Sequence, residues 1–211
     1  MILLKCEACG GRELKKIGNM YECIYCDSKY ILDENEKVVS KELTEAKVIA
    51  LFEESKRLHE ANKYAEELEV LIKAYEMDEN NSKIMVNLGR CYRNLNMIDK
   101  AIECYKKAIE LNPNEGTAYT NMGTIYTLRG DYKEAAQYYE KGLPIIDKAE
   151  FDYWLAYANY AVSVAKLGNP GKAEAMIKEA EAHGYKNGAV IRKMAGIESK
   201  SFGSKLKSLF S

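Results

Sequence analysis

The residues most able to do chemistry in this chain of 211 residues are four cysteines near its start. They form two C-x2-C pairs that are separated by thirteen residues. Each pair forms a tight turn that directs two thiolates toward one centre, and four such sulfurs close a tetrahedral Zn²⁺ site with no open position. The sequence therefore predicts one structural zinc ion, with iron in the same site, or a redox or disulfide role, as the alternatives. The predicted ligands are Cys6, Cys9, Cys23 and Cys26.

Short strands are expected to hold this metal site. Residues 28–32 have strand character. The segments CEACG at residues 6–10 and YECIYC at residues 21–26 resemble a zinc ribbon, in which two short hairpins enclose one metal ion. A segment of this size buries too little surface to fold on its own core. Zinc binding, on the order of 10–16 kcal/mol in comparable peptides, would supply the missing free energy.

The same segment raises the question of nucleic-acid binding. Residues 1–40 carry six Lys and Arg against seven Asp and Glu, and four thiolates around Zn²⁺ add further negative charge. A negatively charged module neutralises phosphates poorly, so the charge balance disfavours nucleic acid as a partner. The basic patch of Arg12, Lys15 and Lys16 supports one alternative. In this alternative the chain is a nucleic-acid-associated adaptor. Its ribbon contacts DNA or RNA, and the rest of the chain recruits a protein.

From residue 42 onward the pattern is helical and repeats every 34 residues. The clearest copies, 82–115 and 116–149, resemble the tetratricopeptide repeat family closely, although Gly142 and Asp147 replace the usual Ala and Pro of the second copy. Small residues in this pattern let the two helices of a repeat touch, and large residues fill the gaps between them. The tyrosines at signature positions are therefore expected in the core. The residues that carry the resemblance are Leu88, Gly89, Tyr92, Ala101, Tyr105, Ala108 and Pro113, then Tyr119, Met122, Gly123, Tyr126, Ala135, Tyr139 and Gly142.

The predicted fold class is mainly α: a tetratricopeptide-type solenoid of four repeats and a capping helix, preceded by the small zinc ribbon with its four cysteine ligands. The first copy is degenerate, because Ser55 and Glu67 occupy positions where small residues normally pack. Residues 33–43 are interpreted as a polar connector, and four extra residues near 143–147 as an added helical turn with a bend. The expected segments are the ribbon at 1–40, the solenoid at 44–198 with repeats at 48–81, 82–115, 116–149 and 154–187 and a cap at 188–198, and a flexible tail at 199–211.

A binding surface is expected along the first helices of the repeats, which line the concave face of such a solenoid. Position 6 of the repeat is asparagine in three copies: Asn87, Asn121 and Asn159. Because an asparagine side chain both donates and accepts, it can bind the backbone of an extended peptide whatever the peptide's side chains. Asparagine is also common at this position in the family, so the ladder alone does not establish binding. Arg90 and Arg93 make this part of the groove basic and favour a ligand with acidic residues or a C-terminal carboxylate.

One well-known ligand class of the family is not predicted. The carboxylate clamp of Hsp70- and Hsp90-binding repeats would need Lys, Asn, Asn, Lys and Arg at five positions. Only Asn87 of this chain matches that set. The chain is therefore predicted to be an interaction module for a protein or extended peptide, and the sequence identifies neither the partner nor the oligomeric state.

An enzyme is not expected. His59 and His183 have no triad or metal partner that the sequence reveals, and Cys91 and Cys104 lie in helical patterns as partly buried thiols. No glycine-rich phosphate loop precedes a helix. The formal net charge of −1, the absence of a leader pattern and the absence of any long apolar run predict a cytoplasmic chain without a membrane span.

Overall fold

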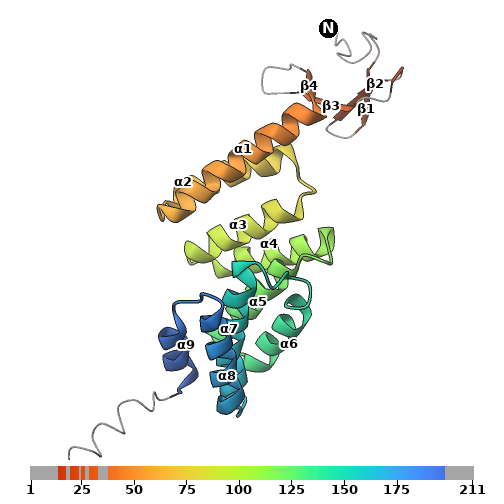
Figure 1. Ribbon diagram of the computed structural model, residues 1–211. Helices are drawn as coiled ribbons and strands as arrows, with labels where there is room; N and C mark the ends of the chain where they lie inside the picture. The colour runs from red at the N-terminus through yellow and green to blue at the C-terminus, as the bar shows by residue number, and fades with distance from the viewer. Residues whose placement is uncertain (1–13, 18–19, 24, 27–28, 33–37, 198–211) are drawn as a thin grey trace, which may run out of the picture. The chain divides into compact units, whose positions relative to one another are not determined.

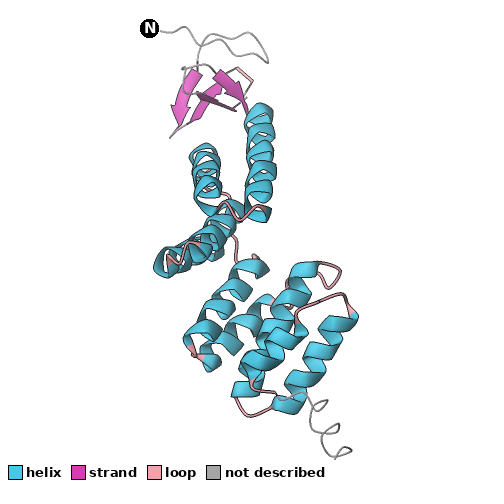
Figure 2. Ribbon diagram, turned by 90° about the vertical axis from the view of Figure 1, so that its left-hand side faces the viewer, coloured by secondary structure: helices cyan, strands magenta, loops and turns pink. Residues whose placement is uncertain are grey.

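The structure is a computed structural model that describes residues 14–17, 20–23, 25–26, 29–32 and 38–197 (Figures 1 and 2). The chain divides into two compact units, Met1–Glu79 and Asn80–Ser211, which are considered separately below. Most of the described residues are helical, which confirms the predicted mainly α class. The predicted tail at 199–211 lies outside the described residues.

The first unit contains an antiparallel sheet of four strands in the order β1-β2-β3-β4. Figure 2 draws these strands in magenta. In register, Leu14 lies opposite Cys23 and Val39 lies opposite Ile31. The strand predicted near residues 28–32 corresponds to β3. The strands are β1 (Leu14–Ile17), β2 (Met20–Cys23), β3 (Lys29–Leu32) and β4 (Val38–Ser40).

The predicted polar connector at 33–43 is wrong over its second half. Val38–Ser40 forms β4, and helix α1 (Lys41–Glu60) begins at the next residue. Two adjacent β-branched valines favour a strand that can pair with β3, and this local preference outweighs the polar residues on either side. No polar spacer therefore separates β4 from the first helix.

Helix α1 pairs with α2 (Tyr64–Met77), and α1 also contacts β3 and β4. The described core of this pair contains Val48, Val70, Leu71 and Ala74, all of them buried. The structure thus forms the degenerate first repeat as a helical hairpin.

The second unit contains seven described helices. Three helical hairpins, α3 with α4, α5 with α6 and α7 with α8, follow one another, and α9 comes last (Figure 1). The helices are α3 (Ser82–Asn94), α4 (Ile98–Leu111), α5 (Gly116–Arg129), α6 (Tyr132–Gly142), α7 (Phe151–Lys166), α8 (Pro170–Ala182) and α9 (Gly188–Ala195).

The turn between the two helices of each described hairpin contains a residue with positive φ. The spacing of these residues along the chain follows the repeat period. Asn62 and Asn96 have φ values of 57° and 60°, and Gly130 and Gly168 have values of 87° and 95°. Asparagine and glycine are the residues that adopt this left-handed conformation most readily. The first three lie 34 residues apart and the fourth follows after 38, so four residues are inserted between the last two hairpins.

The inserted residues do not form the predicted extra helical turn at 143–147. Helix α6 ends at Gly142, residues 143–150 form turns, and α7 starts at Phe151, ahead of the expected repeat start at Trp154. The buried side chains of Leu143 and Ile146 anchor these turns to the core. The extra length is thus divided between a packed turn and an earlier start of the next helix.

Glycine and tyrosine fit together in the hairpins as the signature predicts. A methyl group added at Gly89 would lie 2.5 Å from Cε1 of Tyr105, and one added at Gly123 would lie 3.0 Å from the ring of Tyr139. Both rings are fully buried. The tyrosines at this position are core residues, whereas Tyr92, Tyr119 and Tyr126 are only half-buried.

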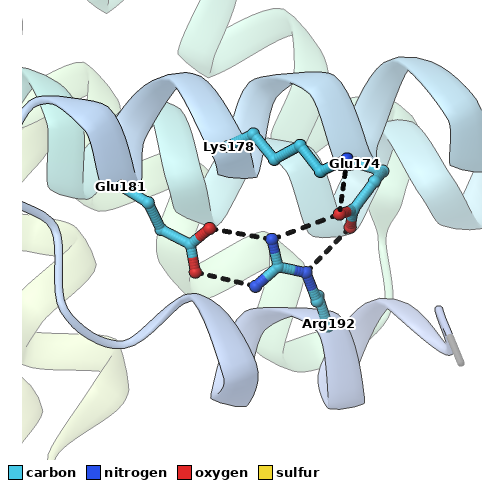
Figure 3. A network of polar contacts seen from close by, with 4 residues as sticks. All are labelled: Glu174, Lys178, Glu181 and Arg192. Atoms are coloured by element: carbon cyan, nitrogen blue, oxygen red, sulfur yellow. Dashed lines mark hydrogen bonds and ion pairs between the residues drawn. The ribbon is translucent and has the colours of Figure 1, made fainter. Parts of the chain in front are cut away.

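Helix α9 packs on α7 and α8, in the place of the predicted cap, and ends at Ala195. Its Arg192 lies between two carboxylates of α8, as Figure 3 shows. Arg192 Nε donates to Glu174 Oε2 at 2.8 Å, and Nη1 donates to Glu181 Oε1 at 2.7 Å. Gly188 gives α9 its close approach, because any side chain there would collide with the Glu181 carboxylate.

Candidate functional site

The three predicted asparagines lie at equivalent places on the first helices of the three hairpins of the second unit. Asn87 belongs to α3, Asn121 to α5 and Asn159 to α7, and each is partly exposed. Helix α3 contacts α5, and α5 contacts α7. We call the side of α3, α5 and α7 that carries these asparagines the first-helix face.

Two predicted site residues are in direct contact on this face. Arg93 Nη1 donates a hydrogen bond to Asn121 Oδ1 at 3.1 Å. The bond joins α3 to α5 and fixes the orientation of the Asn121 amide, since its oxygen accepts and its NH₂ group remains a donor. The NH₂ group of Asn121 thus keeps its two donors, and the oxygen keeps its second lone pair.

The charges of Arg93 and Arg90 act on one hydroxyl of the core, that of Tyr105. Among the described residues it is buried and has no hydrogen-bond partner. Burial raises the pKa of Tyr105 to about 12, and the positive charges of Arg93 and Arg90 oppose that rise. Both arginines are partly exposed. Sequence reasoning treated Tyr105 only as a packing residue, and its missing partner could not be read from the repeat signature.

The fourth hairpin extends the face with apolar and small residues. Asn159 is flanked by the buried residues Ala158 and Val162. Thr127 of α5 and Ser163 of α7 share a buried hydrogen bond of 3.0 Å, which fastens the two helices together. Asn159 is the predicted site residue of this hairpin, whereas the predicted basic residues, Arg90 and Arg93, both lie on α3.

A buried polar cluster in the first unit was also missed. Glu67 is fully buried on α2, where the corresponding positions of the other copies hold alanine. Its Oε1 accepts from Ser55 Oγ at 3.3 Å, and its Oε2 lies 3.0 Å from Nδ1 of His59. The sequence analysis considered only triad and metal partners for His59 and did not identify this contact, because the helical hairpin brings together residues that lie 8 and 12 positions apart in the sequence. A signal was present, since both Ser55 and Glu67 break the small-residue pattern.

This cluster does not have the arrangement of a catalytic triad. In such a triad the imidazole stands between the nucleophile and the acid, and removes the proton of the nucleophile. Here the carboxylate of Glu67 stands between Ser55 and His59. The geometry satisfies a buried carboxylate and does not activate the serine hydroxyl.

The helical cysteines are buried, as predicted. Cys91 is 0% and Cys104 7% exposed. Burial raises the pKa of Cys104 to about 11, with Glu103 adding to the rise and Lys100 opposing it. Cys104 is therefore a protonated thiol at neutral pH, which is a poor nucleophile.

Only half of the predicted zinc ligand set can be placed. Cys23 ends β2 and is buried, and Cys26 lies in the following turn and is exposed. Cys6 and Cys9 lie outside the described residues. Within the part of the chain that the structure describes, no three potential ligands cluster.

The basic patch behind the nucleic-acid alternative is partly balanced by a carboxylate. Lys15 is exposed on β1 and lies directly opposite Glu22 of β2. Opposite charges at paired positions attract each other and weaken the local positive field. Arg12 lies outside the described residues.

Comparisons with known proteins agree with this architecture. Residues 82–115 match one family model described as "Tetratricopeptide repeat", and residues 104–137 match a second model of the same description. Residues 82–137 are tetratricopeptide repeat sequence. A search among curated proteins found no match. Among the helices described, none is long and apolar enough to cross a membrane.

Several solved structures share the fold. The pilF protein of Pseudomonas aeruginosa matches with 16% identity and a TM-score of 0.59 over 66% of this chain, which spans 62% of that chain. PilW, a widely conserved type IV pilus biogenesis factor, matches with 22% identity and a TM-score of 0.57, covering 75% of this chain and 72% of that one. MamA matches with 23% identity and a TM-score of 0.51, covering 64% of this chain and 77% of that one. At these identities the likeness extends to the fold alone.

Proposed function

We propose that this protein is an interaction module whose first-helix face binds a protein partner through an extended peptide. Tetratricopeptide repeats generally mediate protein–protein interaction, and residues 82–137 match that family. The observation that carries the proposal is the contact of Arg93 with Asn121, because it joins two predicted binding residues from neighbouring repeats. Both side chains remain partly exposed.

The polar groups of this face suit a peptide backbone. Asn87 supplies a donor and an acceptor, and the Asn121 amide supplies donors once its oxygen accepts from Arg93. An extended peptide exposes unpaired carbonyl oxygens along its length, which match such donors. Asn159 continues the series on α7. Repeated contacts of this kind hold a chain in register and leave its side chains to determine specificity.

An affinity pull-down from cell extract, followed by mass spectrometry, would identify the partner, and a paired variant tests the face. We expect the double variant Asn87→Ala, Asn121→Ala to bind the identified partner with an affinity lower by about tenfold or more. The reason is that two sets of hydrogen bonds of about 0.5–1.5 kcal/mol each are lost. Thermal unfolding should change little, since both side chains are partly exposed. A matched control is Asn96→Gly, which keeps the left-handed turn and lies outside the face. Unchanged affinity of the paired variant would contradict the proposal.

We also propose that Cys6, Cys9, Cys23 and Cys26 hold one structural zinc ion. The spacing of the two pairs and the pairing of Leu14 with Cys23 support a shared site at one end of the β1–β2 hairpin. When bound, zinc would act by joining the two C-x2-C segments, because four thiolates leave no position for a substrate. The Cys23 thiol contributes from a buried strand end, and Cys26 from an exposed turn.

A further inference from the structure

Two tyrosines in equivalent positions of neighbouring repeats differ in one respect. Tyr105 and Tyr139 both pack against a glycine of the preceding helix, and both are fully buried. The Tyr139 hydroxyl shares a hydrogen bond of 3.0 Å with Thr124 Oγ1. In the earlier repeat the position of Thr124 is occupied by Arg90, and the Tyr105 hydroxyl has no hydrogen-bond partner among the described residues. A buried hydroxyl without a partner is destabilising, so an acceptor would be favourable there.

The ring of Tyr105 crosses α3 at Gly89, which is four residues before Arg93. Residues four apart lie on the same face of a helix, so the phenol hydroxyl points toward the side of α3 that carries Arg93. The positive charge of Arg93 acts on Tyr105, because it opposes the rise in the tyrosine pKa that burial causes. Arg93, in turn, donates to Asn121 of α5.

The three groups together present donors and little that accepts. Among the described residues Arg93 forms no ion pair, and the group that accepts its hydrogen bond is the neutral amide of Asn121. The Asn121 oxygen accepts that bond, and the amide NH₂ is a donor. A guanidinium, an amide NH₂ and a phenol hydroxyl are complementary to a carboxylate, whose two oxygens accept several hydrogen bonds.

We propose that Arg93, Asn121 and Tyr105 form a carboxylate site within the first-helix face. This inference rests on the proposed function and names the chemistry of the ligand: an acidic side chain or the terminal carboxylate of the bound peptide. Arg93 would supply the charge, and the Asn121 amide a second donor. The Tyr105 hydroxyl, which is buried in this structure, would supply the third donor.

The two tyrosines provide a matched pair of variants. Tyr105→Phe removes a hydroxyl without a partner, so the unfolding temperature should stay the same or rise, whereas the affinity for a carboxylate ligand should fall about fivefold. Tyr139→Phe removes a hydroxyl that has a partner in Thr124, so the unfolding temperature should fall and the affinity should stay the same. Arg93→Gln should weaken binding about tenfold or more, because it removes the charge.

The probes are pentaglutamate peptides titrated into the full chain and followed by NMR. A free carboxyl terminus and an amidated terminus distinguish the terminal carboxylate from acidic side chains, and amidated pentaglutamine is the neutral control. Binding of either acidic form, weakened by Tyr105→Phe and not by Tyr139→Phe, would support the site. Absence of wild-type binding, equal binding by Tyr105→Phe, or binding of pentaglutamine with the same affinity would overturn it.

The proposed function can survive that failure. A partner from the pull-down that is lost in the Asn87→Ala and Asn121→Ala variant, but binds Tyr105→Phe and Arg93→Gln as it binds wild type, would show that the face binds a ligand without this carboxylate site. Retained binding in the asparagine variant would instead contradict the face itself.

Discussion

Glu67 is the residue at which this chain departs furthest from the packing rule of its own repeats. The corresponding position in the other hairpins holds Ala101, Ala135 and Ala173, each fully buried. A buried carboxylate is tolerated only when partners compensate for its lost hydration, and here Ser55 and His59 do so. The local packing of α1 against α2 therefore depends on a polar contact.

Removing the His59 side chain should lower the free energy of unfolding more than removing the Glu67 carboxylate. We expect His59→Ala to lower the free energy of unfolding by about 2 kcal/mol, because Glu67 stays buried without its imidazole partner. Glu67→Ala, which restores the residue of the other repeats, should cost less. Urea denaturation of the single and double variants would give the coupling energy as a double-mutant cycle. Equal, independent effects of the two substitutions would show that the contact does not stabilise the hairpin.

Two kinds of contact explain what the sequence could and could not predict. The contacts of Gly89 with Tyr105 and of Gly123 with Tyr139 follow from the repeated signature. In each pair a glycine of the first helix leaves room for the tyrosine ring of the second helix. The contacts of Glu67 with His59 and of Arg93 with Asn121 occur once each. Unique polar contacts depend on the exact orientation of two helices, which periodicity does not specify. The zinc site, with two of its four predicted ligands described, stays a prediction.

Among the elements, α9 depends most on a single side chain. It has eight residues, too few for a stable isolated helix, and its Arg192 contacts Glu174 and Glu181 of α8 (Figure 3). Buried Ile191 and Ala195 add apolar contact with the preceding hairpin. Helix α9 is thus held by a small apolar face and by the ion pairs of Arg192.

Because Arg192 holds α9 through two carboxylates of α8, we expect acid to destabilise the packing of α9. Hydrogen bonding to Arg192 lowers the pKa of Glu181 below its usual value of 4.5. A carboxylate with a lowered pKa stabilises the folded state above its unfolded pKa, and this contribution disappears as the pH falls through the folded value. The protection of the α9 amides against hydrogen exchange, measured relative to the intrinsic rate at each pH, should therefore fall below about pH 4, ahead of the protection in α7.

A charge-deleting variant tests the cause of that loosening. In Arg192→Met the stem still packs but the contacts with Glu174 and Glu181 are absent, so the protection of the α9 amides relative to the intrinsic rate should already be low at about pH 6 and should change little toward about pH 3.5. Lys193→Met, at the next and exposed position, is the control and should behave as wild type. An acid response that persists in Arg192→Met would assign it to another group.

At the scale of the whole molecule, the chain divides after Glu79, within the array of helical hairpins. The first hairpin belongs with the strands, because α1 follows β4 directly and contacts both β3 and β4. The second unit contains its own buried core, from Ile84 on α3 to Ile191 on α9. The proposed zinc ion should therefore stabilise the strands and the start of α1, and the hairpins of the second unit should not depend on it.

Removal of zinc tests this division. A chelator should abolish the strand signal and speed up hydrogen exchange in β1–β4 and the first turns of α1, because a sheet of this size has little core of its own. Most of the helical circular dichroism should persist, since α3–α9 pack on one another. Metal analysis should find one zinc per chain in wild type and in Cys104→Ser, whose thiol lies in α4, and much less in Cys26→Ser. Loss of the entire helical signal with the metal would show that the two units fold as one, and full zinc content in Cys26→Ser would remove that cysteine from the site.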